Sequence, residues 1–144
     1  MKKRVMLSIQ GRQSYTGQEP DLIELVTEGE MEFVSGGWEI RYQESDLTGL
    51  EGVTTMFRVE PERVILTRTG GLRSQMEFVI GQSHDSLYQM PFGALMMTVT
   101  TRSLFFDILP EGGSIDILYD IAIEQSEMGT VEYHLDIRTM ETEE

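Results

Sequence analysis

The chain of 144 residues is 40% hydrophobic and 25% charged, a balance that supports one folded domain and excludes an intrinsically disordered chain. Its 25 acidic and 11 basic residues give a formal net charge of −14, which repels phosphate backbones and argues against nucleic acid as a partner. The absence of cysteine excludes disulfides, thiolate nucleophiles and zinc–thiolate sites.

Alternating apolar and polar residues predict β-strands along the first half of the chain, beginning with a strand around Val5 to Ile9. The segment from Asp21 to Ser35 is a second strand, and we expect a bulge in it at Gly29. The pair Gly36-Gly37 predicts a tight hairpin, because glycine adopts the positive φ that both central turn positions need. Further strands are predicted over residues 38–43, 53–60, 63–69 and 72–80.

The second half of the chain continues the same pattern, with strands over residues 84–90, 95–108, 115–124 and 130–138. The apolar phase of the longest one shifts near Ser103-Leu104, which indicates a bulge or a corner. Turns predicted at residues 110–113 and 127–129 are short enough only for hairpins, so the last three strands should be neighbours. Residues 117, 119 and 121 should then face the same interior as residues 133, 135 and 137.

These elements predict an all-β domain over residues 1–139, followed by an acidic tail at 140–144 that we expect to fray. Regular strands joined by short turns favour an antiparallel up-and-down arrangement of about 8–10 strands. Such a meander avoids exposed edges by closing into a barrel, which is either filled by side chains or holds one small ligand.

Several stretches resemble the YwiB-like family of small bacterial proteins, which carry a domain of unknown function. They are residues 38–44, 59–70, 75–81, 88–93 and 117–121, with the sequences WEIRYQE, VEPERVILTRTG, QMEFVIG, YQMPFG and ILYDI. The resemblance covers nearly the whole chain to Arg138 and implies a calycin-like barrel, similar in shape to lipocalins. It implies no reaction, ligand or catalytic residue.

A polar cluster in the middle of the chain is the candidate ligand-binding site, made up of Arg68, Arg73, Gln75, His84, Tyr88 and Gln89. Amides and an arginine on adjacent strands can hold a carboxylate inside a barrel, and the ten methionines suit an adaptable apolar cavity. The hypothesis is therefore a small apolar or amphipathic ligand, with Arg68 or Arg73 near its polar end. The alternative interpretation is that Arg73, Gln75 and Glu77 belong to an outward, solvated face.

Two other classes of function compete with ligand binding. A protein-interaction or regulatory module, as a homodimer for example, would expose an apolar patch with residues such as Trp38, Tyr42 or Phe92. An enzyme is less favoured, because it would rest on His84 with Tyr88 or Asp85 nearby, and adjacent strand residues point to opposite faces. His134 is expected to be a cross-strand partner on the polar face of the last strand.

No cofactor, catalytic residue or metal site is predicted, since two histidines without cysteine do not form a transition-metal site readily. No apolar run approaches the ~20 residues of a membrane helix or has the length of a secretory leader core. We therefore expect a cytoplasmic protein without a membrane partner.

Overall fold

The structure is a computed structural model that describes residues 2–14, 19–45 and 50–140, all in strands and their connections. Its ten strands are β1 (Lys3–Ser14), β2 (Asp21–Val34), β3 (Gly37–Gln43), β4 (Val53–Glu60), β5 (Arg63–Gly70), β6 (Ser74–Phe78), β7 (Ser83–Met90), β8 (Gly93–Leu109), β9 (Gly112–Ile123) and β10 (Ser126–Thr139). The prediction of an all-β chain with about 8–10 strands is confirmed.

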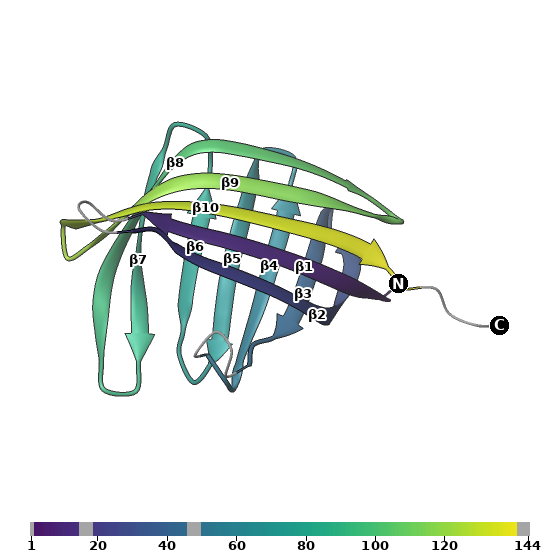
Figure 1. The fold of residues 1–144 in the computed structure, drawn as a ribbon, viewed down its shortest axis with the longest axis horizontal. Helices are drawn as coiled ribbons and strands as arrows, with labels where there is room; N and C mark the ends of the chain where they lie inside the picture. Colours follow the sequence, from purple (N-terminus) through teal and green to yellow (C-terminus); the bar gives the residue numbers. More distant parts are fainter. Residues whose placement is uncertain (1, 15–18, 46–49, 141–144) are drawn as a thin grey trace.

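All ten strands belong to one antiparallel sheet in the order β6-β5-β4-β3-β2-β1-β10-β9-β8-β7. Every strand pairs with its neighbour in sequence except β6 and β7, and β1 pairs with β10 over ten residues from Val5 to Ser14. This last pairing brings the two halves of the meander together and forms a nearly closed barrel (Figure 1). The last three strands are consecutive, as predicted.

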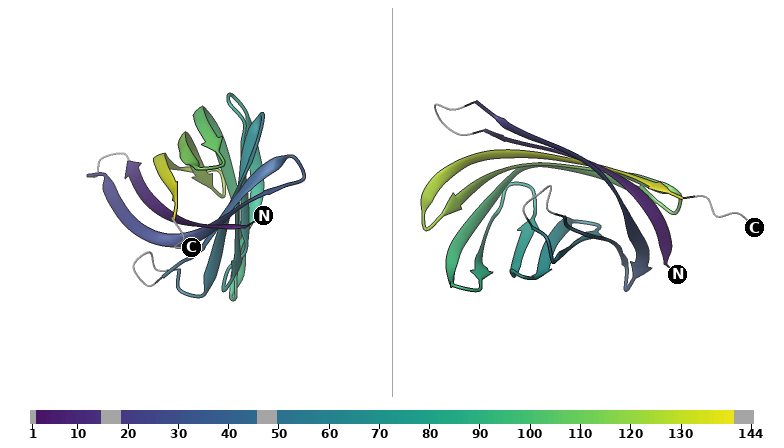
Figure 2. Two further views of the ribbon diagram at one scale, coloured as in Figure 1. Left: turned by 90° about the vertical axis from the view of Figure 1, so that its right-hand side faces the viewer. Right: turned by 60° about the horizontal axis from the view of Figure 1, so that its bottom comes forward.

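Two bent strands carry the sheet around its corners (Figure 2). β2 pairs with β1 up to Met31 and with β3 from Gly29 onward, in a ladder that has no register shift. The predicted bulge at Gly29 is therefore wrong. Glycine is needed here because the backbones of β2 and β3 approach each other closely. A Cβ at this position would lie 2.5 Å from the carbonyl oxygen of Arg41.

The second bent strand, β8, does carry a bulge. Its register against β9 shifts between Thr101 and Ser103, at the place where the apolar phase of the sequence changes. One extra residue on a strand increases its local twist and lets it turn from one wall of the barrel to the other. The predicted bulge or corner is confirmed.

The interior of the barrel is filled mostly by apolar side chains at alternate positions of the strands. Phe57, Phe78 and Leu135 are fully buried, and Ile117 and Tyr119 lie on the same side of the sheet as Val131 and Leu135. The predicted common face of β9 and β10 is therefore confirmed, although Ile121 and Tyr133 are only partly buried.

Two predicted hairpin turns lie at other residues in the structure. The β2–β3 hairpin turns at Ser35 and Gly36, both of which have positive φ, whereas Gly37 begins β3. The β9–β10 hairpin turns at Glu124 and Gln125, also with positive φ, because β10 already begins at Ser126. Residues 127–129, which were predicted to form this turn, lie instead inside β10, where the pairing with β9 has a register shift.

The predicted strand from Leu72 to Ile80 is shorter than expected, since β6 covers only Ser74 to Phe78 and Ile80 is 60% exposed. Beyond β6 the chain leaves the ladder, and Gly81 and Gln82 exchange hydrogen bonds with Thr101 of β8. The expected fraying of the acidic tail concerns residues 141–144, which lie outside the described residues. Met140 still donates a hydrogen bond to the carbonyl of Arg4.

Candidate functional site

The barrel wall has a seam between β6 and β7, the two strands that are neighbours in sequence without forming a ladder (Figure 1). In the described part of the chain, one bridge joins them: Arg73 and Gln89 exchange backbone hydrogen bonds of 2.8 and 2.7 Å. A slot of about 380 Å³ lies beside this bridge. Its lining comes from β5, β6, β7 and the residues next to them: Thr67, Arg68, Thr69, Arg73, Ser74, Gln75, Ser86, Leu87 and Gln89.

The structure brings together four of the six residues predicted as a ligand site. Arg68, Arg73, Gln75 and Gln89 all line the seam slot. Arg73, Gln75 and Gln89 are exposed, so these three side chains lie on the outward face of the wall. Arg68 differs from them, because it follows Val64 and Leu66 on the inward side of β5 and its side chain is only 17% exposed.

His84 and Tyr88 do not line the slot. Both alternate with exposed residues on β7 and are partly buried on the inner side, where Tyr88 packs against the core. The Nδ1 atom of His84 is buried without a hydrogen-bond partner in the described residues. Asp85 is exposed and accepts a hydrogen bond from Thr98, so His84 and Asp85 do not form a catalytic pair.

A row of polar side chains crosses the inner surface of four neighbouring strands. Tyr42 of β3 is paired with Thr55 of β4, Thr55 with Arg68 of β5, and Arg68 with Ser74 of β6. Thr55 is fully buried, and Tyr42 and Ser74 are at most 7% exposed. A fifth polar residue, Glu44, joins the row beyond the end of β3, with a side chain only 1% exposed.

These buried groups bond to one another through Thr55. The Thr55 hydroxyl donates to the Glu44 carboxylate at 2.5 Å and accepts from Nε of Arg68 at 3.4 Å, while Arg68 and Glu44 form an ion pair at 3.9 Å. Among the described residues, only the Nε atom of Arg68 takes part in a hydrogen bond. Its two terminal nitrogens are thus available to a ligand inside the wall.

A cavity of about 120 Å³ lies next to this cluster, at the end of the barrel near the β3–β4 connection. Apolar residues of β1, β2 and the connection form one side of it, and Arg68, Glu44, Tyr42 and Tyr133 form the other. The apolar side consists of Ile9, Gly11, Ile23, Leu25 and Leu50. Arg68 lines both this cavity and the seam slot.

Tyrosine hydroxyls complete the polar side of the cavity. The hydroxyls of Tyr42 and Tyr133 lie 3.3 Å apart, within hydrogen-bond distance. Burial raises the pKa of both phenols, and it raises the pKa of the neighbouring Tyr119 to about 12. The phenols therefore stay protonated at neutral pH and can both donate to and accept from a ligand.

Two of these residues escaped the sequence-based prediction although they carry a signal. Thr55 stands between Val53 and Phe57, and Ser74 stands two residues before Met76, each in phase with inward apolar residues. A polar residue in an apolar phase marks a polar group inside the barrel. Glu44 lies beyond its strand, so periodicity could not place it.

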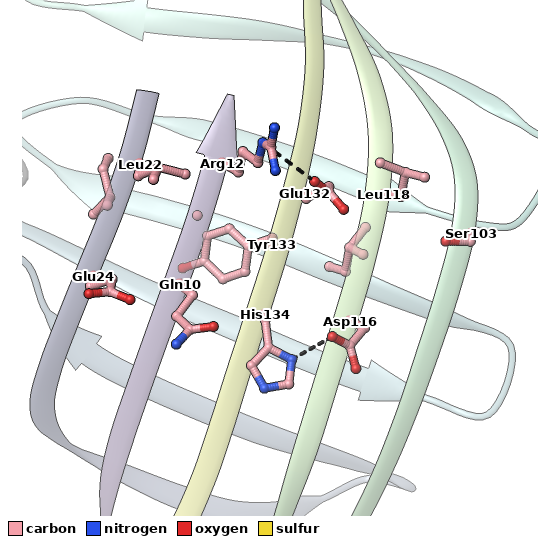
Figure 3. A pocket seen from close by; sticks show the side chains of 13 residues that line it. Gln10, Arg12, Leu22, Glu24, Ser103, Asp116, Leu118, Glu132, Tyr133 and His134 are labelled. Carbon is pink, nitrogen blue, oxygen red and sulfur yellow. Dashed lines mark hydrogen bonds and ion pairs between the residues drawn. The ribbon is translucent and has the colours of Figure 1, made fainter. Parts of the chain in front are cut away.

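A larger groove of about 390 Å³ crosses the outside of β2, β1, β10 and β9 (Figure 3). Four of its five acidic or basic side chains are already paired: Arg12 with Glu132 at 4.0 Å, and His134 with Asp116 across the strands. The fifth, Glu24, forms no ion pair with the described residues. The bond to Asp116 of β9 confirms the expectation of a cross-strand partner, and His134 also bonds to Asp136 of its own strand at 2.9 Å. A ligand gains less from polar groups that are already bonded than from unpaired ones.

Of the three residues named for an exposed apolar patch, the structure covers two and exposes one. Tyr42 is 4% exposed, and Trp38 packs against the core and against the ring of Phe33, at 5.0 Å between centroids. Phe92, in the β7–β8 turn, is the one of the three residues that is strongly exposed, at 86%.

The described residues contain neither a metal-binding group of side chains nor a membrane-spanning helix. No group of three or more His, Asp or Glu side chains there is arranged to hold a metal ion. Within the same residues, no helix has the length and apolarity needed to cross a bilayer.

Comparison with known proteins agrees with the family resemblance seen in the motifs. A relative in Bacillus subtilis (strain 168), described as an uncharacterized beta-barrel protein YwiB, is 34% identical over 82 residues. That match covers 57% of this chain and 56% of the relative, so it spans about half the length of the relative. The crystal structure of the ywiB protein from Bacillus subtilis covers 97% of this chain and 94% of its own. Its TM-score of 0.86 at 23% identity shows that the two proteins share a fold.

A family model described as a domain of unknown function, DUF1934, matches residues 7–137, which is most of the chain. The chain therefore belongs to the DUF1934 family.

Proposed function

We propose that this protein binds a small amphipathic molecule in the cavity beside Arg68, Tyr42 and Tyr133. One observation carries the proposal: the terminal nitrogens of an arginine inside the barrel wall have no partner among the described residues, and they adjoin a cavity with apolar walls. The Arg68 side chain is 17% exposed, and a carboxylate in the cavity would accept charge-assisted hydrogen bonds from these nitrogens.

The volume of the cavity limits the ligand. Since an apolar cavity of about 150 Å³ holds a benzene ring, 120 Å³ accommodates on the order of five or six non-hydrogen atoms. A long acyl chain would have to displace core side chains such as Ile9 and Leu25, which close packing resists. The proposed ligand is therefore smaller than the cargo that a hollow barrel would hold.

The polar side of the cavity selects the head group. A carboxylate matches the planar guanidinium of Arg68 best, because two parallel N–H donors face two oxygens. Tyr42 and Tyr133 add neutral hydroxyls, which can donate to the same oxygens. Glu44 stays paired with Thr55 and Arg68, so its charge is already compensated.

Titration with straight-chain carboxylates from acetate to octanoate, followed by NMR, tests the proposal. Affinity should rise with chain length as apolar area is buried, and then level off or fall when the chain outgrows the cavity. Native mass spectrometry of protein purified from its own host provides a second readout, with a small co-purified acid as the expected result.

Two substitutions on the same strand separate the cavity from the surface. Leu25→Phe adds bulk to a side chain that lines the cavity and should abolish binding, whereas Leu22→Phe changes a residue 72% exposed and should preserve it. Binding that survives Leu25→Phe unchanged, or no binding of any acid in the series, would refute the cavity as a ligand site.

A further inference from the structure

We propose that the seam between β6 and β7 is a second binding site, separate from the cavity, and that it takes an oxyanion. The ligand class is a carboxylate or phosphate group on a small molecule. This inference goes beyond the proposed function. The slot and the cavity share Arg68, but Arg73, Ser74 and Ser86 line the slot and not the cavity.

The backbone of the seam supplies unpaired donors. Arg73 and Gln89 form a hydrogen-bonded pair, and in an antiparallel ladder the next such pair lies two residues further along each strand. That pair would be Gln75 and Leu87, yet no β-bridge joins these residues in the described structure. Their N–H groups therefore point into the seam, and both residues line the slot.

Two hydroxyl groups in the slot also lack partners. Ser74 is 7% exposed, and its Oγ is buried without a hydrogen-bond partner among the described residues. The same holds for the Oγ of Ser86 on the opposite strand. Buried hydroxyls are normally bonded, so two unpaired ones on the inner side of residues that line a slot of about 380 Å³ are donors that a polar group entering the seam would use.

The charge of the slot fixes the sign of that group. Its lining contains Arg68 and Arg73 and no carboxylate, in a chain of net charge −14. Arg73 differs from most arginines of this protein, since seven of the nine form ion pairs and Arg73 forms none with any described residue. The nearby Glu77 is already paired with Arg63 at 2.8 Å. Arginine, hydroxyl and backbone N–H donors together are the groups that bind oxyanions.

The test is a titration of the whole protein, at constant ionic strength, with inorganic phosphate in one arm and acetate in the other. Amide shifts should saturate and centre on Gln75 and Leu87, because their N–H groups would donate to the anion. The arm that binds more tightly identifies phosphate or carboxylate as the source of the oxygens. Shifts spread over the surface, or no saturation with either anion, would overturn the proposal.

Two matched substitutions remove one positive charge each. Arg73→Gln should weaken anion binding by about tenfold or more, since it removes a charge-assisted hydrogen bond. Arg138→Gln is the control, because Arg138 is also exposed and forms no ion pair with the described residues, but lies away from the slot. An equal loss in both variants would show a general charge effect and overturn the site.

Two further variants test whether binding needs the shape of the arginine side chain as well as its charge, and whether it needs the cavity. Arg73→Lys keeps the charge but loses the planar fork, so it should bind more weakly than the parent. Leu25→Phe, which fills the cavity, should leave phosphate and acetate shifts at the seam unchanged. If Leu25→Phe abolished the shifts at Gln75 and Leu87, the seam would not be a separate site.

Discussion

The backbone of Gly29 packs so closely against Arg41 that a Cβ at Gly29 would lie 2.5 Å from the Arg41 carbonyl oxygen and 2.9 Å from Cδ1 of Leu7. β2 turns at this point from its partner β1 toward β3. The close contact is what allows the corner, because any side chain would push the two ladders apart.

We therefore expect Gly29→Ala to destabilise the protein by about 1–3 kcal/mol, the usual cost of overpacking, measured by urea unfolding. Gly11→Ala is the control, since a Cβ there would meet no atom within 4 Å. It should be neutral or slightly stabilising, because alanine reduces the entropy of the unfolded chain. Equal unfolding midpoints for the two variants would contradict the role assigned to Gly29.

The inward face of β9 can be tested with two adjacent residues. Ile117 is 3% exposed and belongs to the core, whereas Leu118 points outward and lines the outer groove. Ile117→Asp should unfold the protein, because an unpaired buried carboxylate costs several kcal/mol against a total stability of about 5–15 kcal/mol. Leu118→Asp should stay folded by circular dichroism. The opposite outcome would reverse the register of β9.

His134 should make stability depend on pH near neutrality. The hydrogen bond to Asp116, with a further one to Asp136, raises the pKa of the imidazole above its usual 6.5. The stabilisation is fully present below the unfolded pKa and is lost as pH rises through the folded pKa.

The difference in unfolding free energy between the parent and His134→Asn should accordingly be largest in mildly acidic solution and disappear in alkaline solution. Denaturant titrations across this range measure it. A difference that stays constant with pH would show that packing, and not protonation, explains the effect of His134.

Ion pairs on the outer face of β3 to β6 should make the stability of the protein depend on pH in acidic solution. Hydrogen bonds from Arg63 at 2.6 Å and Arg58 at 2.6 Å lower the pKa of Glu60 below its usual 4.5. The resulting stabilisation is present above the unfolded pKa and is lost as pH falls through the folded pKa.

Glu60→Gln should therefore lose stability at neutral pH and show a weaker decline in acid than the parent. Because the groups are close to solvent, added salt should reduce the difference between the two proteins. Melting curves at low and high salt, each recorded across the acid range, provide the measurement. A salt-independent difference would argue against a charge effect.

The sequence by itself determined the strands and most of their faces. Two-residue alternation places Ile115, Ile117 and Tyr119 inward on β9, because a half-buried strand must bury every second side chain. The phase change near Ser103 likewise located the bulge, since an extra residue shifts every later side chain by one position.

The sequence predicted the positions of the turns less accurately. Glu124 and Gln125 adopt positive φ although neither is glycine, because pairing of β9 with β10 fixes the hairpin there. The same pairing draws the glycine at 129 into a strand. Local preference predicted a turn at that glycine, and the ladder on either side overrode it.

Only the tertiary structure decided which polar residues form a site. Arg68 and Arg73 are five residues apart in one polar stretch, yet Arg68 lies inside the wall beside Glu44 and Thr55, whereas Arg73 lies on the exposed rim of the seam. Tyr42 meets Tyr133 through the β1–β10 closure, which no local pattern encodes. The physical reason is that alternation fixes the face of each side chain, but the pairing and bending of the sheet fix which faces meet.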